Sequence, residues 1–204
     1  MKRAFLSLIL VPALTAALAV SGAAQTAIHP GGWLRVDGDS SLHKWSSTAT
    51  VVAMTFQPAD GASPSLAEAI KGSKIKGLEV KVGVAGLKSG ESGLDRNLRK
   101  AMKEKEFPEV VYRLESYTLT KGAGDGALSA KTQGQLTIAG QTKPISMEVA
   151  LRMGPDGPEA SGHYTLKMSD FGVKPPTLML GTIKTRDPVT IAFDLLLAPK
   201  EKAP

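Results

Sequence analysis

The chain has 204 residues, a formal net charge of +6 and no cysteine. It therefore cannot be a disulfide-stapled miniprotein, and any metal site that uses cysteine is excluded. The positive charge is mild, and lysines such as Lys71, Lys76 and Lys81 are scattered among glycine and apolar positions. Because nucleic-acid-binding proteins concentrate their positive charge on one face, we expect no nucleic-acid partner.

Residues 1–24 have the order of a secretory signal peptide. Lys2 and Arg3 precede an apolar run over 4–20, and small residues follow over 21–24. We predict cleavage after Ala24 and a periplasmic location; the alternative is a retained membrane anchor. The remaining chain, 204 minus 24, has 180 residues, and without Lys2 and Arg3 its charge is +4. This length is typical of one domain, 25–204.

The first half of the mature chain contains short β-rich segments. Residues 33–36 and 42–56 carry aromatic and β-branched side chains, which favour strands. Residues 58–64 predict a loop, and 65–70 could form one helical turn. Apolar and other residues then alternate over 78–84, which indicates a strand with one apolar face.

The sequence period changes after this strand. Leu94, Leu98 and Met102 recur every four residues, which is typical of an amphipathic helix. Ser92 is the expected N-cap, and Pro108 the residue that stops the helix.

The next strand spans 109–119, and a glycine-rich turn follows it. Residues 134–151 then show two alternating apolar segments separated at Gly140, which predicts a β-hairpin. Pro144 lacks an N–H donor, so it belongs at the start of the second arm or at a sheet edge.

The C-terminal part has alternating strands at 164–168 and 189–197, joined by a non-periodic loop at 170–181. The total is about eight strands and one helix with no internal repeat. This pattern is typical of both β-sandwiches and β-barrels, and strand spacing alone does not separate them.

The sequence lacks the residue patterns of catalysis. Its three histidines, His29, His43 and His163, are far apart, and no metal-ligand spacing, nucleophile elbow or phosphate loop is present. His43 is the one histidine that we weighed as a catalytic or ligand residue. We expect no catalytic residue, no metal and no cofactor.

The apolar strand faces allow two designs. In one, two sheets enclose a solid core; in the other, a barrel of eight strands encloses a ligand. The inward candidates are mostly slim, and Gly83, Gly134 and Ala139 lie among them, which leaves room for a cavity. The helix and the exposed apolar side chains of 170–181 could cover the opening, or simply complete the core.

Four stretches resemble the YceI-like family of secreted, lipocalin-like lipid-binding proteins. They are SSLHKW at 40–45, the helix and strand at 93–116, GQLTIAGQTKPISMEV at 134–149 and the segment from 166 to 197 that contains DFGVKPP. The first stretch departs from the commonest family motif, Asp followed shortly by His-Ser, and is closer to a Leu-His-x-Trp subgroup. The resemblance implies an all-β fold: an eight-stranded antiparallel lipocalin-like barrel with one amphipathic α-helix and a long apolar interior.

On this basis we expect a non-catalytic periplasmic protein that binds a long apolar lipid, such as a polyprenol, an isoprenoid quinone or a fatty amide. A transient contact with a membrane surface and a homodimer are further expectations. Four residues, Leu98, Met102, Phe171 and Met179, are assigned to the mouth or lid. The predicted wall residues are Val80, Val82, Val84, Tyr112, Leu114, Ile138, Met147, Val149, Ile191 and Phe193.

Two other functions compete with lipid binding. One is a structural or interaction module with a packed core, whose loop at 170–181 is a partner surface. The weaker one is an isoprenoid-modifying enzyme that uses His43.

Overall fold

The computed structural model describes residues 25–63, 65–124, 126–178 and 182–197. The predicted signal peptide and Met179 lie outside these residues. Eleven strands occur in the described part of the chain. They are β1 Thr26–Ile28, β2 Gly31–Ser40, β3 Lys44–Ala49, β4 Ala53–Pro58, β5 Ile75–Gly83, β6 Glu109–Lys121, β7 Ala127–Ile138, β8 Gln141–Gly154, β9 Gly157–Lys167, β10 Thr177–Leu178 and β11 Ile183–Leu196.

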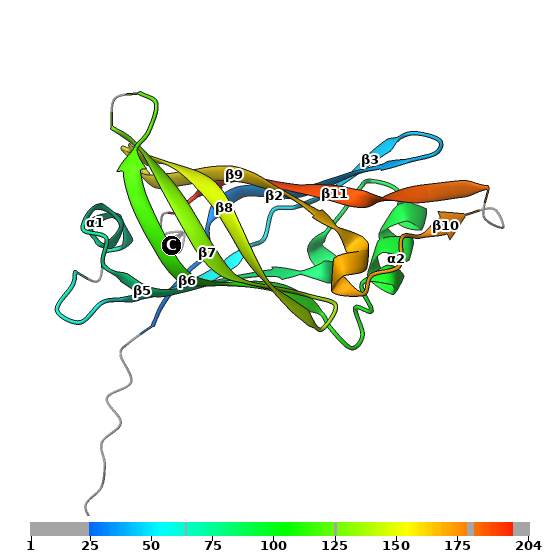
Figure 1. Ribbon diagram of the computed structural model, residues 1–204, viewed down its shortest axis with the longest axis horizontal. Coiled ribbons are helices and arrows are strands. Elements are labelled where there is room, and N and C mark those ends of the chain that lie inside the picture. The colour runs from blue at the N-terminus through cyan, green and yellow to red at the C-terminus, as the bar shows by residue number, and fades with distance from the viewer. Residues whose placement is uncertain (1–24, 64, 125, 179–181, 198–204) are drawn as a thin grey trace, which may run out of the picture.

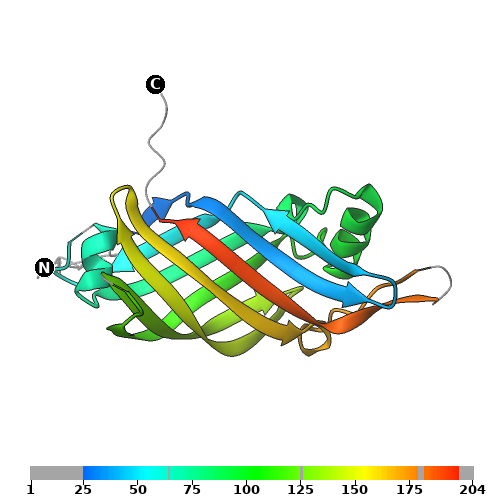
Figure 2. The same ribbon diagram turned by 90° about the horizontal axis from the view of Figure 1, so that it is seen from above.

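Ten of these strands form one antiparallel sheet in the order β1-β4-β5-β6-β7-β8-β9-β11-β2-β3, and β10 pairs only with β11. The sheet curls into an elongated half-barrel (Figures 1 and 2). The prediction of eight strands is therefore wrong in number, although the all-β antiparallel class is correct. The count differs because 42–56 divides into β3 and β4, and because two short strands, β1 and β10, have too few residues for a visible alternation.

The β7–β8 hairpin is the predicted hairpin, extended at both ends. Its two-residue turn is Ala139-Gly140, and both residues have positive φ, 48° and 80°. This combination is required by a type I′ turn, whose twist matches that of the strands. Pro144 pairs only with β7, because β9 joins β8 from Val149 onward. The proline thus lies on a free strand edge, as predicted.

The described residues contain two α-helices, α1 Leu66–Lys71 and α2 Ser92–Ala101. The first lies where one helical turn was expected at 65–70, and the second is the predicted amphipathic helix. They lie at opposite ends of the half-barrel (Figure 1). Ser92 is the first helical residue and not the N-cap, since Glu91 holds that position without a side-chain hydrogen bond. The helix also ends before Pro108, because Lys103 takes a positive φ of 52°. No described helix has the length and apolarity to cross a membrane.

The predicted loop at 170–181 is partly structured. The 3-10 helix η2, Met168–Phe171, precedes β10, and the side chains of Phe171 and Val173 are only 3% exposed. The expectation that these two side chains lie on the surface is therefore wrong. They point inward because Gly172, at φ 66°, reverses the chain between them.

Two groups of buried side chains fill the two ends of the half-barrel. The group at the α1 end contains Phe56 and Ile70, and the group at the α2 end contains Leu136 and Phe171. Between β3 and the segment after β5, the backbones of Thr48 and Lys88 exchange two hydrogen bonds of 2.8 and 3.0 Å. The 3-10 helix η1, Val84–Gly86, lies between the end of β5 and Lys88.

Candidate functional site

An apolar cavity of about 300 Å³ runs inside the half-barrel. This volume lies at the lower end of the range for small-molecule sites, roughly 300–1,000 Å³. Residues from both helices and from the strands line it, since every second residue of a strand faces inward. No charged side chain occurs among the described lining residues. The wall can therefore desolvate an apolar chain but offers no partner for an ionic group.

Twelve of the fourteen predicted site residues line this cavity. Strands β5 to β8 and β11 supply the wall residues, α2 supplies Leu98, its C-cap is Met102, and η2 supplies Phe171. The twelve are Val80, Val82, Leu98, Met102, Tyr112, Leu114, Ile138, Met147, Val149, Phe171, Ile191 and Phe193. Their contact with a lipid stays a prediction.

The other two residues are Val84 and Met179. Val84 is fully buried in η1 but is not a lining residue, because the chain leaves the β5 alternation at Gly83. Met179 lies outside the described residues.

Several lining residues were missed by the sequence reasoning. Leu66 and Ile70 of α1 face the cavity at one end, and Leu34 and Trp45 line it from β2 and β3. The spacing of Leu66 and Ile70, one helical turn, could have indicated a second capping helix. Trp45 carried no such signal, since its segment alternates poorly and its inward direction follows from pairing with β2.

Three aromatic rings of the wall lie against glycines of the neighbouring strand. Trp45 pairs with Gly38 and Phe193 with Gly162, and Tyr112 lies over Gly134. A Cβ atom at Gly134 would lie 2.7 Å from the Tyr112 hydroxyl, and one at Gly162 would lie 2.9 Å from Cζ of Phe193. The space that Gly134 was predicted to leave free is therefore occupied by the Tyr112 ring.

Among the lining residues that the structure describes, two polar atoms are buried without a hydrogen-bond partner: Nε1 of Trp45 and the hydroxyl of Tyr112. Burial raises the pKa of the Tyr112 phenol, and the nearby Thr132 hydroxyl opposes the shift. Thr132 does not meet hydrogen-bond geometry with the phenol, and its own proton is donated to the Met147 carbonyl at 3.0 Å. The phenol is therefore neutral at pH 7 and able to donate.

Two aspartates hold the segments that cover the α2 end. Asp95 of α2 accepts hydrogen bonds from the backbone N–H and the hydroxyl of Ser89 at 2.8 and 2.7 Å. Asp187 accepts the same pair from Ser169 of η2 at 2.8 and 2.6 Å. In each case the serine side chain, followed by its backbone N–H, lowers the pKa of the carboxyl group. Both carboxylates are thus stabilised in the ionised form.

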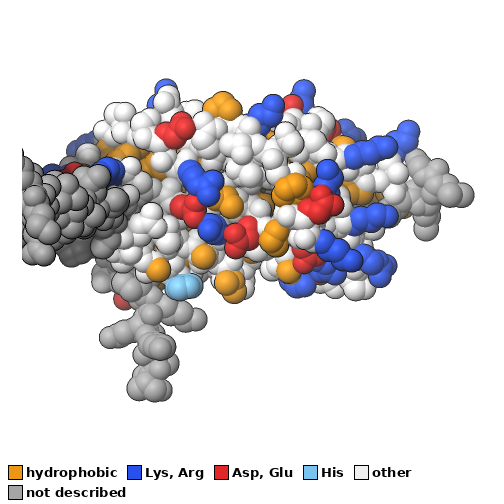
Figure 3. All heavy atoms as spheres, turned by 90° about the horizontal axis from the view of Figure 1, so that it is seen from below, with side chains coloured by type: hydrophobic (Ala, Val, Ile, Leu, Met, Phe, Trp, Pro, Cys, Tyr) orange, Lys and Arg blue, Asp and Glu red, His pale blue; other side chains and the backbone are white. Residues whose placement is uncertain are grey.

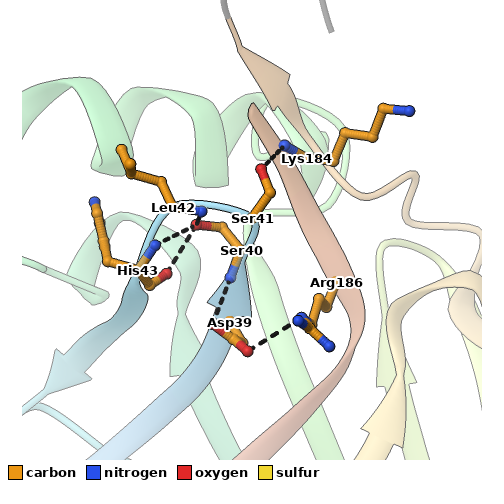
Figure 4. Close-up of polar contacts among 7 residues, drawn as sticks. All are labelled: Asp39, Ser40, Ser41, Leu42, His43, Lys184 and Arg186. Atoms are coloured by element: carbon orange, nitrogen blue, oxygen red, sulfur yellow. Dashed lines mark hydrogen bonds and ion pairs between the residues drawn. The ribbon is translucent and has the colours of Figure 1, made fainter. Parts of the chain in front are cut away.

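The β2–β3 turn contains His43 and is joined to β11 by polar contacts (Figure 4). Arg186 forms an ion pair with Asp39 at 3.1 Å, and Ser41 exchanges hydrogen bonds with the backbone of Lys184. His43 is exposed, and its Nδ1 lies 2.8 Å from the Lys44 carbonyl. The ring of His43 thus contacts the backbone carbonyl of the next residue, which is not an acid–base group.

The outer face carries interspersed charges of both signs, with lysine and arginine gathered towards the α2 and β10 end (Figure 3). Ion pairs such as Arg113–Glu79, at 2.6 Å, join neighbouring strands on this face. Within the described residues, no group of histidine and acidic side chains could hold a metal ion. The apolar cavity is therefore the candidate site.

The YceI-like domain model matches residues 34–197. The chain belongs to the YceI-like family. No curated protein matches it significantly.

Solved structures share this fold at low sequence identity. BcnA of Burkholderia cenocepacia superposes with a TM-score of 0.58 at 17% identity, covering 79% of this chain and 94% of BcnA. A polyisoprenoid-binding domain of Saccharophagus degradans, implicated in plant cell wall breakdown, gives 0.62 at 11%, covering 87% and 100%. The YceI protein of Campylobacter jejuni gives 0.50 at 18%, covering 98% and 100%. These similarities support the half-barrel fold.

Proposed function

We propose that this YceI-like protein binds one long apolar lipid, of the polyprenol, isoprenoid quinone or fatty amide kind, inside the half-barrel and without catalysis. The observation that carries the proposal is the wall itself, which is apolar along the barrel and lined from α1 at one end to α2 at the other. A hydrocarbon chain in this cavity leaves water over most of its length. Each buried CH₂ group contributes about 0.8 kcal/mol before the ordering cost.

Family membership supports the proposal, as does the structural similarity to a domain described as polyisoprenoid-binding. The apolar N-terminal segment supports export of the protein and action in the periplasm after removal of residues 1–24. Membrane contact and a homodimer stay predictions.

Native mass spectrometry of the exported protein, purified without detergent, tests both parts of this proposal. The polypeptide mass should correspond to a chain that starts at Gln25, and a second mass should correspond to one bound lipid. Extraction and fragmentation then identify the lipid.

Two variants on β8 make the test specific to the cavity. Val149 lines the cavity, whereas the adjacent Ala150 is exposed. Val149→Phe should lower the bound-lipid fraction about tenfold by filling the space, and Ala150→Phe should leave it at the wild-type level. Equal lipid content in both variants, or a wild-type protein that takes up no lipid, would refute binding in this cavity.

A further inference from the structure

Strands β8 and β9 are paired over only part of their length. Their paired residues run from Val149–Gly162 to Gly154–Gly157. Towards the α2 end, residues 141–148 of β8 pair only with β7, and residues 163–167 of β9 pair only with β11. Figure 1 shows the two strands diverging there. The sheet is therefore split along this length, where no strand pairing among the described residues joins its two sides.

A groove on the outside of the molecule follows this split. It is bordered by residues 143–145 of β8 and 164–167 of β9. Four of its side chains also line the cavity: Ile145, Tyr164, Leu166 and Phe171. One layer of side chains therefore separates the cavity from solvent here. Ile145, Leu166 and Phe171 are buried, so this layer is closed in the structure.

The 3-10 helix η2 covers the split. Its Phe171 packs with Ile145 of β8 and Leu166 of β9 in one buried group. Asp187 ties the helix to β11, because its carboxylate accepts hydrogen bonds of 2.8 and 2.6 Å from the backbone N–H and the hydroxyl of Ser169. These hydrogen bonds are exposed, and η2 itself belongs to no strand. The helix can therefore move away from the split without breaking its own strand pairing.

The seam between β3 and the segment after β5 is closed differently. There the backbones of Thr48 and Lys88 exchange two hydrogen bonds. Opening this seam would leave backbone groups unpaired, whereas opening the split displaces side chains and one short helix. The split is thus the easier place for the wall to part.

We propose that the lipid enters and leaves the cavity sideways, through the split between β8 and β9, when η2 moves away from β8. This assignment rests on the proposed lipid binding and adds the route of the ligand and the segment that controls its rate. A lateral opening admits a long chain along its side, so the chain does not have to pass either helix-covered end. Lid movements of this kind often limit the rates of binding and release.

A cross-link across the split tests this route. The chain has no cysteine, so two introduced cysteines are its only thiols. Ser146 and Thr165 are exposed, one on each side, and would lie opposite each other if the β8–β9 register continued beyond Val149. Joining Ser146→Cys to Thr165→Cys with a short bismaleimide should slow uptake and release of phytanol, a branched isoprenoid alcohol, about tenfold. The Kd should not change, because a blocked route slows both directions equally.

Ala150→Cys joined to Ser161→Cys is the matched control, since these residues are already directly paired on the same two strands. The same reagent should leave both rates at the wild-type level. Trp45 lines the cavity, so its fluorescence reports phytanol, and Trp33→Phe makes it the sole tryptophan. Excess lipid vesicles collect the released phytanol.

Asp187→Ala tests the part played by η2. It removes the acceptor that holds Ser169, and release of phytanol should become about tenfold faster. Asp194→Ala is the control, because Asp194 is an exposed acidic residue of the same strand, β11. It should release phytanol at the wild-type rate.

Equal release rates from the two cross-linked proteins would show that the lipid does not pass between β8 and β9. If Asp187→Ala releases phytanol no faster than Asp194→Ala, η2 is not the segment that opens, and the proposed control of the rate is wrong. In both cases lipid binding itself would stand. If phytanol does not bind the wild-type protein, the proposed function fails and the route with it.

Discussion

Glycines of the sheet determine how close the aromatic rings of the cavity wall lie to the backbone. Gly38, Gly134 and Gly162 each lack the Cβ that would collide with a neighbouring ring. The rings consequently lie along the wall, and this keeps the interior open. Glycine within a strand often marks such a close approach.

Replacing Gly134 with alanine should destabilise the protein. The new Cβ would meet the Arg113 carbonyl, which is backbone and cannot turn away, as well as the Tyr112 ring. Overpacking of this kind costs about 1–3 kcal/mol, which urea unfolding would measure. Gly83→Ala is the control, because a Cβ at Gly83 meets nothing within 4 Å. Equal unfolding midpoints for the two variants would contradict this role of Gly134.

At the scale of elements, α2 depends on one carboxylate for its placement. Asp95 is the buried residue of this helix, whereas the apolar Leu94 and Leu98 are only partly buried and line the cavity. The hydrogen bonds from Ser89 fix the first turn of α2 to the segment that precedes it. The helix is thus held by the hydrogen bonds of Asp95 and by the apolar contacts of Leu94 and Leu98 at the cavity.

Asp95→Asn should lower the melting temperature at pH 7 and have less effect in acid. The folded pKa of Asp95 lies below its ordinary value of 3.8. Its contribution to stability is therefore complete above about pH 4 and is lost as the pH falls through the lowered folded value. Thermal melts between pH 7 and pH 2 should show the wild-type and variant curves converging. Asp156→Asn, in the exposed β8–β9 turn, controls for loss of a charge. A constant difference at all pH values would contradict the anchor.

At the scale of the whole molecule, a half-barrel with an open interior should gain stability from its ligand. The cavity walls lack contacts that a bound chain would supply. At a free lipid concentration of 100 times Kd, binding stabilises the folded state by about 2.7 kcal/mol. For a domain of this size we expect a rise in melting temperature of roughly 5–10 °C. Calorimetry of delipidated protein with and without phytanol measures it. No rise under saturating conditions would mean that the cavity does not bind phytanol in the folded state.

Local patterns predicted most of the wall. Along β6, Tyr112 and Leu114 were predicted as wall residues, and both line the cavity. The β7–β8 turn followed from Gly140. The same reasoning misplaced Val84, because alternation does not reveal where a strand gives way to a 3-10 helix.

The sequence by itself determined the antiparallel β class, the β7–β8 hairpin and most of the residues that share a face, because these depend on the two-residue period of a strand and on turn chemistry. Only the tertiary structure decided that the sheet curls into a half-barrel of ten paired strands with a cavity between α1 and α2. It also decided that Trp45 and Tyr112 pack against the same buried group at the α2 end. Those properties depend on contacts between strands far apart in the chain, which no local period records.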